Sequence, residues 1–430
     1  MPDNVVKRLY AEARKLHQQK HIQLVLYQMI RYLTAGESHG PALTAIVDGL
    51  PAGLSLTPEH INVQLRRRQQ GYGRGNRMKI ETDSVEILSG IRFGKTIGSP
   101  LTLLIRNADW KNWTEKMSQF ERPERPVKPV EVPRPGHADF AGALKYGFED
   151  IRPVIERASA RETAARVAAC TTARVLLAEC AIHIGSYLSA IGPAIEEETP
   201  KELHALLAEN AEKLSQIADK SPVRMIDPAL EEQAIKLIDE AKQRGDTLGG
   251  IIEVFVTGLP IGLGSYAQFD RKLDGELGKA ILSIQAVKGV EIGTAFRNAV
   301  SWGSQVHDEI FVGKDAKPLR KTNRAGGLEG GMTNGEILHL RIAMKPISTL
   351  MNPLHSINLA TMQETLSHIE RSDVCAAPAC AVIAEAVIAP VLANALLEKF
   401  GGDSIDELQE RLASYRQKLM ENFQRRTFTP

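Results

Sequence analysis

The stretch VCAAPACAVIAEAVIAPVLANALLE at residues 374–398 has an apolar residue at nearly every position and carries one internal charge, Glu385. A second stretch, TAARVAACTTARVLLAECAIHI at residues 163–184, has the same character. A helix that is apolar on most sides either spans a membrane or lies inside a protein core. Because both stretches contain charges and are rich in Ala, Cys and Thr rather than in Leu and Phe, we expect two buried core helices and no membrane span.

Two helices that are buried on all sides need apolar surfaces above and below them, and β-sheets on either face are a natural solution. Strand patterns occur between the helical ones, so we predict a mixed α/β (α+β) fold. The expected strands are residues 44–47, 79–88, 101–106, 250–256 and 337–344. The expected helices are residues 58–68, 159–182, 228–242, 373–398 and 404–424, with a polar helical insertion on the surface at 195–220.

The composition is that of a folded protein without a strong charge bias. Of the 430 residues, 43% are hydrophobic and 24% are charged, and the net charge is +1, whereas a nucleic-acid-binding domain is usually strongly basic. The four cysteines form no CxxC pair, which favours a reducing compartment such as the cytoplasm. No GxGxxG motif follows a strand and opens a helix, and GxxxxGK[ST] is absent, so the common nucleotide-binding folds are not indicated.

Two histidines lie in short turns, where a ring can be presented without steric cover. His39 lies in GESHGP at residues 36–41, and His137 lies in RPGHAD at residues 134–139, which closes a Pro-rich loop. Each histidine could act in catalysis or could simply bond to the local backbone, and the spacing alone leaves both interpretations open.

Arginine and glycine cluster in RRRQQGYGRGNR at residues 66–77. Guanidinium groups bind carboxylate and phosphate oxygens through paired hydrogen bonds, and glycines let backbone N–H groups approach an anion. Neighbouring residues on a helix point about 100° apart, so Arg68, Arg74 and Arg77 are better ligand candidates than Arg67. A solvated charged surface or an RNA-binding patch would have a similar composition.

The segment ERASARE at residues 156–162 stands at the head of the first buried helix. Ser159 and Glu162 have the spacing of a capping box, which is a structural role. A helix N-terminus is also an anion site, and Arg157 and Arg161 would strengthen it for a phosphate.

Three later segments are also candidates. GGLEGGMTNG at residues 326–335 has the glycine density of a close backbone approach, and KPIST at residues 345–349 adds a cation and two hydroxyls. In ERSD at residues 370–373, Asp373 could cap the second buried helix or transfer a proton beside a cofactor.

From about Arg31 to about Lys399, the order and spacing of these motifs resemble the chorismate synthase family. The matching segments are GESHG (36–40), DGLP (48–51), RRQ (67–69), GYGRG (71–75), RPGHAD (134–139), RASARET (157–163), GDTLGG (245–250), SIQAVKGVEIG (283–293), KP (345–346) and RSD (371–373).

The resemblance implies a β-α-β sandwich with central buried helices between antiparallel sheets. It also implies a carbon–oxygen lyase that converts 5-enolpyruvylshikimate 3-phosphate to chorismate and phosphate by anti 1,4-elimination, the last step of the shikimate pathway to the aromatic amino acids. The family reaction has no net redox change but requires reduced FMN. A homotetramer is implied as well, and we expect no metal ion.

The resemblance also assigns roles to residues. His39, as an imidazolium, would stabilise or protonate the reduced flavin, His137 would protonate the leaving phosphate or stabilise its charge, and Asp373 would move a proton at flavin N5. Substrate and NADPH would contact Arg68, Arg74, Arg77 and Arg161. FMN would contact Arg157, Ala158, Ser159, Gln285, Ala286, Gly330, Lys345, Pro346, Ile347, Ser348, Thr349 and Arg371.

The charges of these ligands agree with the arginine-rich motifs. The substrate carries a phosphate and two carboxylates and FMN adds another phosphate, so a dry pocket for both needs several paired cations. This requirement explains local arginine clusters in a protein whose net charge is close to zero.

We expect one domain at residues 29–430 with a terminal helix at 404–424. Residues 1–28 precede it as an extension without a secretory signal pattern, and the resemblance assigns them no role. The sequence leaves open whether the enzyme reduces its own flavin with NADPH or takes up flavin that is already reduced.

Two rival functions remain at this point. An FMN oxidoreductase would consume reductant stoichiometrically, whereas an eliminase needs only catalytic flavin. An RNA-binding protein that uses residues 66–77 would bind in a steeply salt-dependent way.

Overall fold

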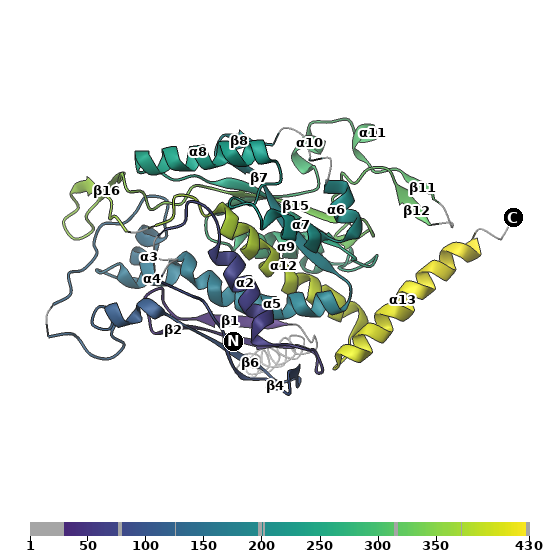
Figure 1. The fold of residues 1–430 in the computed structure, drawn as a ribbon, viewed down its shortest axis with the longest axis horizontal. Helices are drawn as coiled ribbons and strands as arrows, with labels where there is room; N and C mark the ends of the chain where they lie inside the picture. The colour runs from purple at the N-terminus through teal and green to yellow at the C-terminus, as the bar shows by residue number, and fades with distance from the viewer. Residues whose placement is uncertain are drawn as a thin grey trace, which may run out of the picture.

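The computed structural model describes residues 30–75, 80–124, 126–196, 200, 203–313, 317–370 and 372–426 (Figure 1). Three predictions fall outside these residues: the extension at 1–28, and the ligand roles of Arg77 and Arg371.

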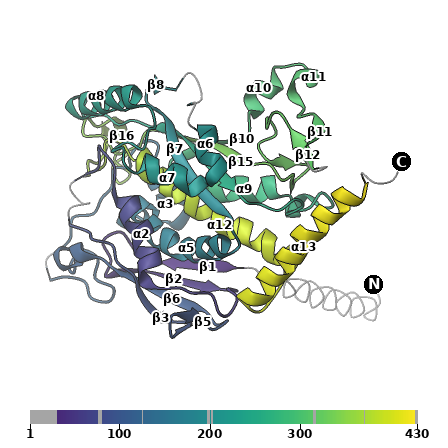
Figure 2. The ribbon, with the colours of Figure 1, turned by 45° about the vertical axis from the view of Figure 1, so that its right-hand side comes forward.

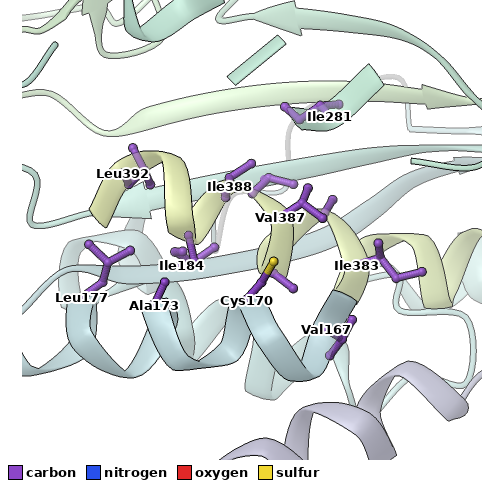
Figure 3. Close-up of a cluster of buried hydrophobic side chains, with 14 of the residues drawn as sticks. Val167, Cys170, Ala173, Leu177, Ile184, Ile281, Ile383, Val387, Ile388 and Leu392 are labelled. Atoms are coloured by element: carbon purple, nitrogen blue, oxygen red, sulfur yellow. The ribbon is translucent and has the colours of Figure 1, made fainter. Parts of the chain in front are cut away.

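The two apolar stretches form α5 (Thr163–Glu179) and α12 (Ala377–Phe400), which pack against each other in the middle of the molecule. Figure 3 shows Cys170 of α5 and Val387 and Ile388 of α12 in one buried cluster. Small Ala and Cys side chains allow the two helices to approach closely. By length and hydropathy α12 could cross a membrane, but 89% of its apolar window is buried inside the fold, so the prediction of core helices is confirmed.

A sheet covers each side of this helical layer, and all neighbouring strands in both sheets are antiparallel (Figures 1 and 2). The predicted arrangement of central helices between two antiparallel sheets is therefore confirmed. The first sheet has the order β1 (Arg31–Ala35), β2 (Ala42–Asp48), β6 (Leu101–Arg106), β3 (Glu86–Ser89). The second has the order β10 (Val287–Ile292), β15 (Leu338–Met344), β9 (Gly250–Thr257), β7 (His183–Ile191), β8 (Ala194–Ile195).

Further helices complete the layers and the edges. α13 extends away from the sandwich in both views (Figures 1 and 2). The helices are α2 (Pro58–Gln69), α3 (Asp139–Tyr146), α4 (Arg152–Ala158), α6 (Leu203–Glu209), α7 (Ala211–Ala218), α8 (Pro228–Arg244), α9 (Leu273–Leu282), α10 (Ala295–Ala299), α11 (Gly303–Val306) and α13 (Ile405–Arg426). Short hairpins are formed by β4 (Ile91–Arg92) with β5 (Lys95–Thr96), β11 (Ile310–Val312) with β12 (Pro318–Arg320), β13 (Leu328–Glu329) with β14 (Met332–Thr333), and β16 (His355–Ile357) with β17 (Glu364–Leu366).

Two segments differ from the prediction in extent. The strand expected at 79–88 is confined to Glu86–Ser89 among the described residues. The polar segment at 195–220 is predicted as a surface insertion, and it contributes α6 and α7. Leu207 of α6 and Leu214 of α7 pack against Tyr187 and Phe255 of the second sheet. These helices therefore cover the outer face of that sheet.

The first buried helix begins later than its capping-box spacing predicts. A 3₁₀ turn at Ala160–Glu162 precedes α5, and Ser159 Oγ accepts a hydrogen bond from the backbone N–H of Arg161. The carboxylate of Glu162 instead accepts a hydrogen bond from Thr34 of β1 at 2.8 Å. The predicted capping box is therefore wrong, because tertiary contact with the first sheet engages Glu162.

The charge inside α12 is held by arginines from neighbouring elements. Glu385 is fully buried, and burial opposes its ionisation, but the guanidinium groups around it hold the pKa of this carboxyl well below its ordinary value. Its oxygens accept hydrogen bonds from Arg67, Arg174, Arg224, Ser186 and Ser215.

We predict that Glu385→Ala lowers the free energy of unfolding by about 3–5 kcal/mol, because the buried guanidinium groups lose their counter-charge. Urea unfolding of the variant and of the wild type measures the change. The control is Glu232→Ala, which removes an exposed ion pair with Lys236 on α8 and should leave the unfolding midpoint nearly unchanged. Equal destabilisation by both substitutions would contradict the prediction.

Candidate active site

A pocket of about 740 Å³ lies where the loops that precede α5 and α12 meet the loops that follow β1 and β15. This volume is typical of cofactor and small-molecule sites, which occupy roughly 300–1,000 Å³. Many of the predicted site residues line it together: His39, His137, Asp373, Ala158, Ser159, Gln285, Ala286, Lys345, Ile347, Ser348 and Thr349.

His39 lies in the loop after β1, and its ring is held on several sides. Its Nδ1 atom lies 2.9 Å from Oε2 and 3.0 Å from Oε1 of Glu156, and its backbone N–H donates to Oε2 at 2.8 Å. Trp113 stacks on the imidazole with ring centroids 3.8 Å apart, and Nε2 lies 4.0 Å from Asp109 Oδ2. The ring is therefore fixed at the pocket wall with one nitrogen bound to a carboxylate.

His137 lies in the turn before α3 and is held in a similar way. Its Nδ1 atom lies 2.5 Å from Oδ1 of the buried Asp139, which also accepts a hydrogen bond from Arg134 Nε at 2.8 Å. Burial opposes ionisation of Asp139, but the hydrogen bonds from His137 and Arg134 hold its pKa below the ordinary value. Both candidate catalytic histidines are thus paired with buried carboxylates through Nδ1.

Asp373 is held by the glycine-rich loop rather than by a helix. Its Oδ1 accepts the backbone N–H of Gly75 at 2.7 Å, and its Oδ2 lies 3.3 Å from Arg74 Nε. A Cβ on Gly75 would lie 2.9 Å from the carbonyl oxygen of Ser372, so this approach requires glycine. α12 begins only at Ala377, so the alternative in which Asp373 caps that helix is wrong.

Alternating charges connect the two histidine pairs along the pocket wall. Arg152 Nη1 lies 3.5 Å from Glu156 and 2.5 Å from Glu370, and Arg134 Nη1 lies 3.7 Å from Glu370. Burial opposes ionisation of Glu370, but hydrogen bonds from His368 and Arg152 and the positive charges of both arginines lower its pKa to about 2. The wall therefore carries fixed positive and negative charge beside the pocket.

Lys345 and Gln285 also belong to the pocket lining and carry polar side chains. Burial and the nearby charge of Lys288 lower the pKa of the Lys345 ammonium group, whose Nζ donates to the carbonyl of Pro346 at 3.2 Å. Oε1 of Gln285 is buried and has no hydrogen-bond partner among the residues that the structure describes. Ala286 has a backbone φ of 65°, a conformation that L-residues other than glycine rarely adopt.

The structure does not bring every predicted ligand residue to this pocket. Arg68 and Arg161 are buried beside it and share Asp83, at 2.7 Å and 2.5 Å. Arg157 donates to the Thr34 carbonyl. Gly330 lies in the turn of the hairpin β13–β14 and Pro346 between lining residues, and neither is part of the lining.

Several lining residues were not singled out by the sequence. Trp113 and Asp109 stand in a charged loop without periodicity, and Arg134, Glu156 and Glu370 stand inside quoted motifs without a ligand role. For the charged residues among them, the one available signal was that segments rich in Arg and Glu accompany the turns that carry the histidines.

The RNA-binding alternative is not supported by the arginine cluster at 66–68. Arg67 and Arg68 are directed into ion pairs with Glu385 and Asp83, and exposed Arg66 pairs with Glu59. These guanidinium groups therefore form internal contacts rather than a continuous basic surface. Within the described ranges, no group of three or more His, Cys, Asp or Glu residues could hold a metal ion.

A pocket with paired histidine–carboxylate sites, an aspartate and several cations defines an acid–base enzyme for a small anionic substrate. The model of the chorismate synthase family matches residues 30–397, and the chain belongs to that family. It is a lyase that forms chorismate and phosphate from 5-enolpyruvylshikimate 3-phosphate in the shikimate pathway.

Individual relatives agree with this assignment. The chain is 67% identical over 390 residues to a chorismate synthase of Chloroherpeton thalassium, covering 91% of this chain and all of the relative. It is 65% identical over 396 residues to that of Prosthecochloris aestuarii, covering 92% of this chain and all of the relative. A crystal structure of chorismate synthase superposes with a TM-score of 0.73 at 41% identity, covering 91% of this chain and 99% of that one.

The depressed pKa of Glu370 predicts an acid-dependent loss of stability. Because its folded pKa is about 2, below the ordinary value of 4.5, its ionised form stabilises the folded state above pH 4.5, and this contribution is lost as the pH falls toward 2. We predict that the difference in melting temperature between wild type and Glu370→Gln narrows between about pH 6 and about pH 3. A difference that stays constant over this range would overturn the prediction.

Proposed function

We propose that this pocket binds reduced FMN and 5-enolpyruvylshikimate 3-phosphate together, and that His39, His137 and Asp373 carry the acid–base steps of the elimination. The observation that supports this proposal is the convergence of these three residues, from segments more than 90 positions apart, on one pocket. General acid–base catalysis requires such groups within reach of one bound molecule.

The pocket residues fit the phosphate and the ring N–H groups of a flavin mononucleotide. Lys345 supplies a cation, Ser348 and Thr349 supply hydroxyls next to it, and Gln285 supplies a buried acceptor without a partner in the described chain. Leaving a buried acceptor unsatisfied costs roughly 1–3 kcal/mol, which a ligand N–H group would offset. When bound, reduced FMN supplies the electron density that the family reaction requires.

Three side chains of the protein carry out proton transfer and charge stabilisation. His137, held by Asp139 and Arg134, donates a proton to the phosphate oxygen that leaves or balances its charge. Asp373, held by Arg74 and Gly75, is placed to accept and return a proton. His39, which lines the same pocket, would stabilise negative charge on a bound flavin.

Arginine has an indirect role at several positions. Arg74 acts by holding Asp373, and Arg68 and Arg161 act by holding the buried Asp83. Arg134 lines the pocket itself, so among the arginines that the structure describes it is the one best placed to meet a substrate carboxylate or phosphate.

The assembly that we propose is a homotetramer. Leu33 and Ile46 are paired across β1 and β2 on the outer face of the first sheet, and they are 77% and 49% exposed in the single chain. Exposed apolar sheet surface of this kind favours burial against another subunit. The buried free thiols of all four cysteines support a reducing compartment such as the cytoplasm.

We predict that His39→Ala and His137→Ala each lower kcat by roughly a hundredfold to ten-thousandfold, as expected for acid–base residues. Circular dichroism and melting temperature should stay close to those of the wild type. The matched control is His183→Ala, a histidine paired with Glu212 on the protein surface, which should retain wild-type turnover. Wild-type values of kcat in both pocket variants would contradict the acid–base roles of His39 and His137.

An anaerobic assay tests the reaction as a whole. With substrate and a small amount of reduced FMN, the protein should release chorismate and phosphate in equal amounts over many turnovers per flavin. Repeating the assay with oxidised FMN and NADPH shows whether the protein reduces its own flavin. Reductant consumption that matches product formation would indicate an oxidoreductase and contradict the proposal.

A further inference from the structure

Glu156 clamps the His39 loop at three points. Its backbone carbonyl accepts the N–H of Ser38 at 3.1 Å, its Oε2 accepts the N–H of His39 at 2.8 Å, and both carboxylate oxygens lie within 3.0 Å of His39 Nδ1. The Glu156 side chain is completely buried. Glu156 of α4 therefore fixes the position of both the backbone and the ring of His39, which lies 117 positions earlier in the chain.

We propose that Glu156 is the positioning residue of His39, and that its carboxylate presents Nε2 of the imidazole to the reacting molecules. This inference rests on the proposed role of His39. Glu156 itself does not have to contact substrate or flavin in order to act, because it acts through the histidine.

The tautomer of His39 follows from the chemistry of its partner. An ionised carboxylate only accepts hydrogen bonds, so the nitrogen that faces it must carry the hydrogen. Nδ1 is therefore protonated, and Nε2 is the nitrogen that exchanges a proton or donates a hydrogen bond on the pocket side. Trp113, stacked at an interplanar angle of 23°, prevents the ring from turning out of this plane.

Further charged groups surround the Glu156–His39 pair. Arg152 lies 3.5 Å from its Oε1, and this guanidinium also lies 5.5 Å from the Trp113 ring centroid. Asp109 lies 4.0 Å from Nε2 of His39. His39 is thus placed between two carboxylates, of which Glu156 alone bonds to Nδ1.

Glu156→Gln tests the proposal because it keeps the shape of the side chain and reverses one hydrogen bond. The amide oxygen can still accept from the His39 backbone, while an NH₂ group, which only donates, replaces the second acceptor beside Nδ1 and the negative charge that favours the Nδ1 hydrogen is lost. We expect kcat to fall by at least about tenfold and by at most the roughly 10⁴-fold known for changing a carboxylate that orients a catalytic histidine to its amide. The KM for substrate and the affinity for FMN should change little.

Glu253→Gln is the matched control. Glu253 is buried and bonded to His339 Nε2 at 2.7 Å and to Ser189 at 2.7 Å, on β9 and outside the pocket lining. It should reproduce any general effect of neutralising a buried glutamate beside histidine, while kcat of the folded protein stays at the wild-type level. An equal loss of kcat in both variants would overturn the inference.

A double-mutant cycle with His39→Ala separates positioning from a merely structural role. If Glu156 acts through His39, then His39→Ala/Glu156→Gln has the same kcat as His39→Ala alone. If the two losses multiply, the positioning role is rejected. Glu156→Asp enters the same cycle in case the glutamine variant folds poorly.

Failure of the proposed function would look different from failure of this inference. If His39→Ala retains wild-type turnover, then the proposed catalytic role of His39 is rejected, and the positioning role of Glu156 is rejected with it. If His39→Ala is impaired and Glu156→Gln and Glu156→Asp are both fully active, only the positioning role is overturned.

Discussion

Charges that are removed from water need partners, and this requirement shapes both the core and the pocket. In the core, Glu385 is the counter-charge for guanidinium groups that reach it from three other elements. Beside the pocket, Asp83 pairs with both Arg68 and Arg161. Because an unpaired buried charge is far more costly than any single apolar contact, these pairs determine which faces of the helices and loops can meet.

The ion pairs in the core also help to position Asp373 in the pocket. Arg67 joins α2 to α12 through Glu385, and the chain that leaves α2 forms the loop whose Gly75 and Arg74 hold Asp373. Asp373 lies just before α12, the helix that carries Glu385. The carboxylate in the pocket and the carboxylate in the core both bond to residues of one short segment, so an error in the packing of α2 would displace Asp373.

The sequence predicts the parts that depend on short-range pattern. The apolar stretches around Cys170 and Glu385 are buried helices between sheets as expected, because an apolar surface on all sides has few other solutions. Their boundaries were less predictable, since Glu162 bonds to Thr34 of β1 instead of capping α5. The arginines show the same limit: composition indicates that Arg68 needs an anion, but only the fold shows that Asp83 is that anion.

The position of the pocket follows from the character of the two central helices. Their sides are buried, and the polar groups on them, such as Glu385, are already paired inside the core, so a ligand meets this layer at the helix ends. Ser159 and Ala160 before α5 and Ala376 before α12 line the pocket, and free backbone N–H groups with a positive helix dipole favour anions at such ends. Histidine-bearing turns from other elements then need rigid partners to reach this point. The clamp of Glu156 on the loop of His39 is such a partner, because it fixes this turn to a helix that ends at the same pocket.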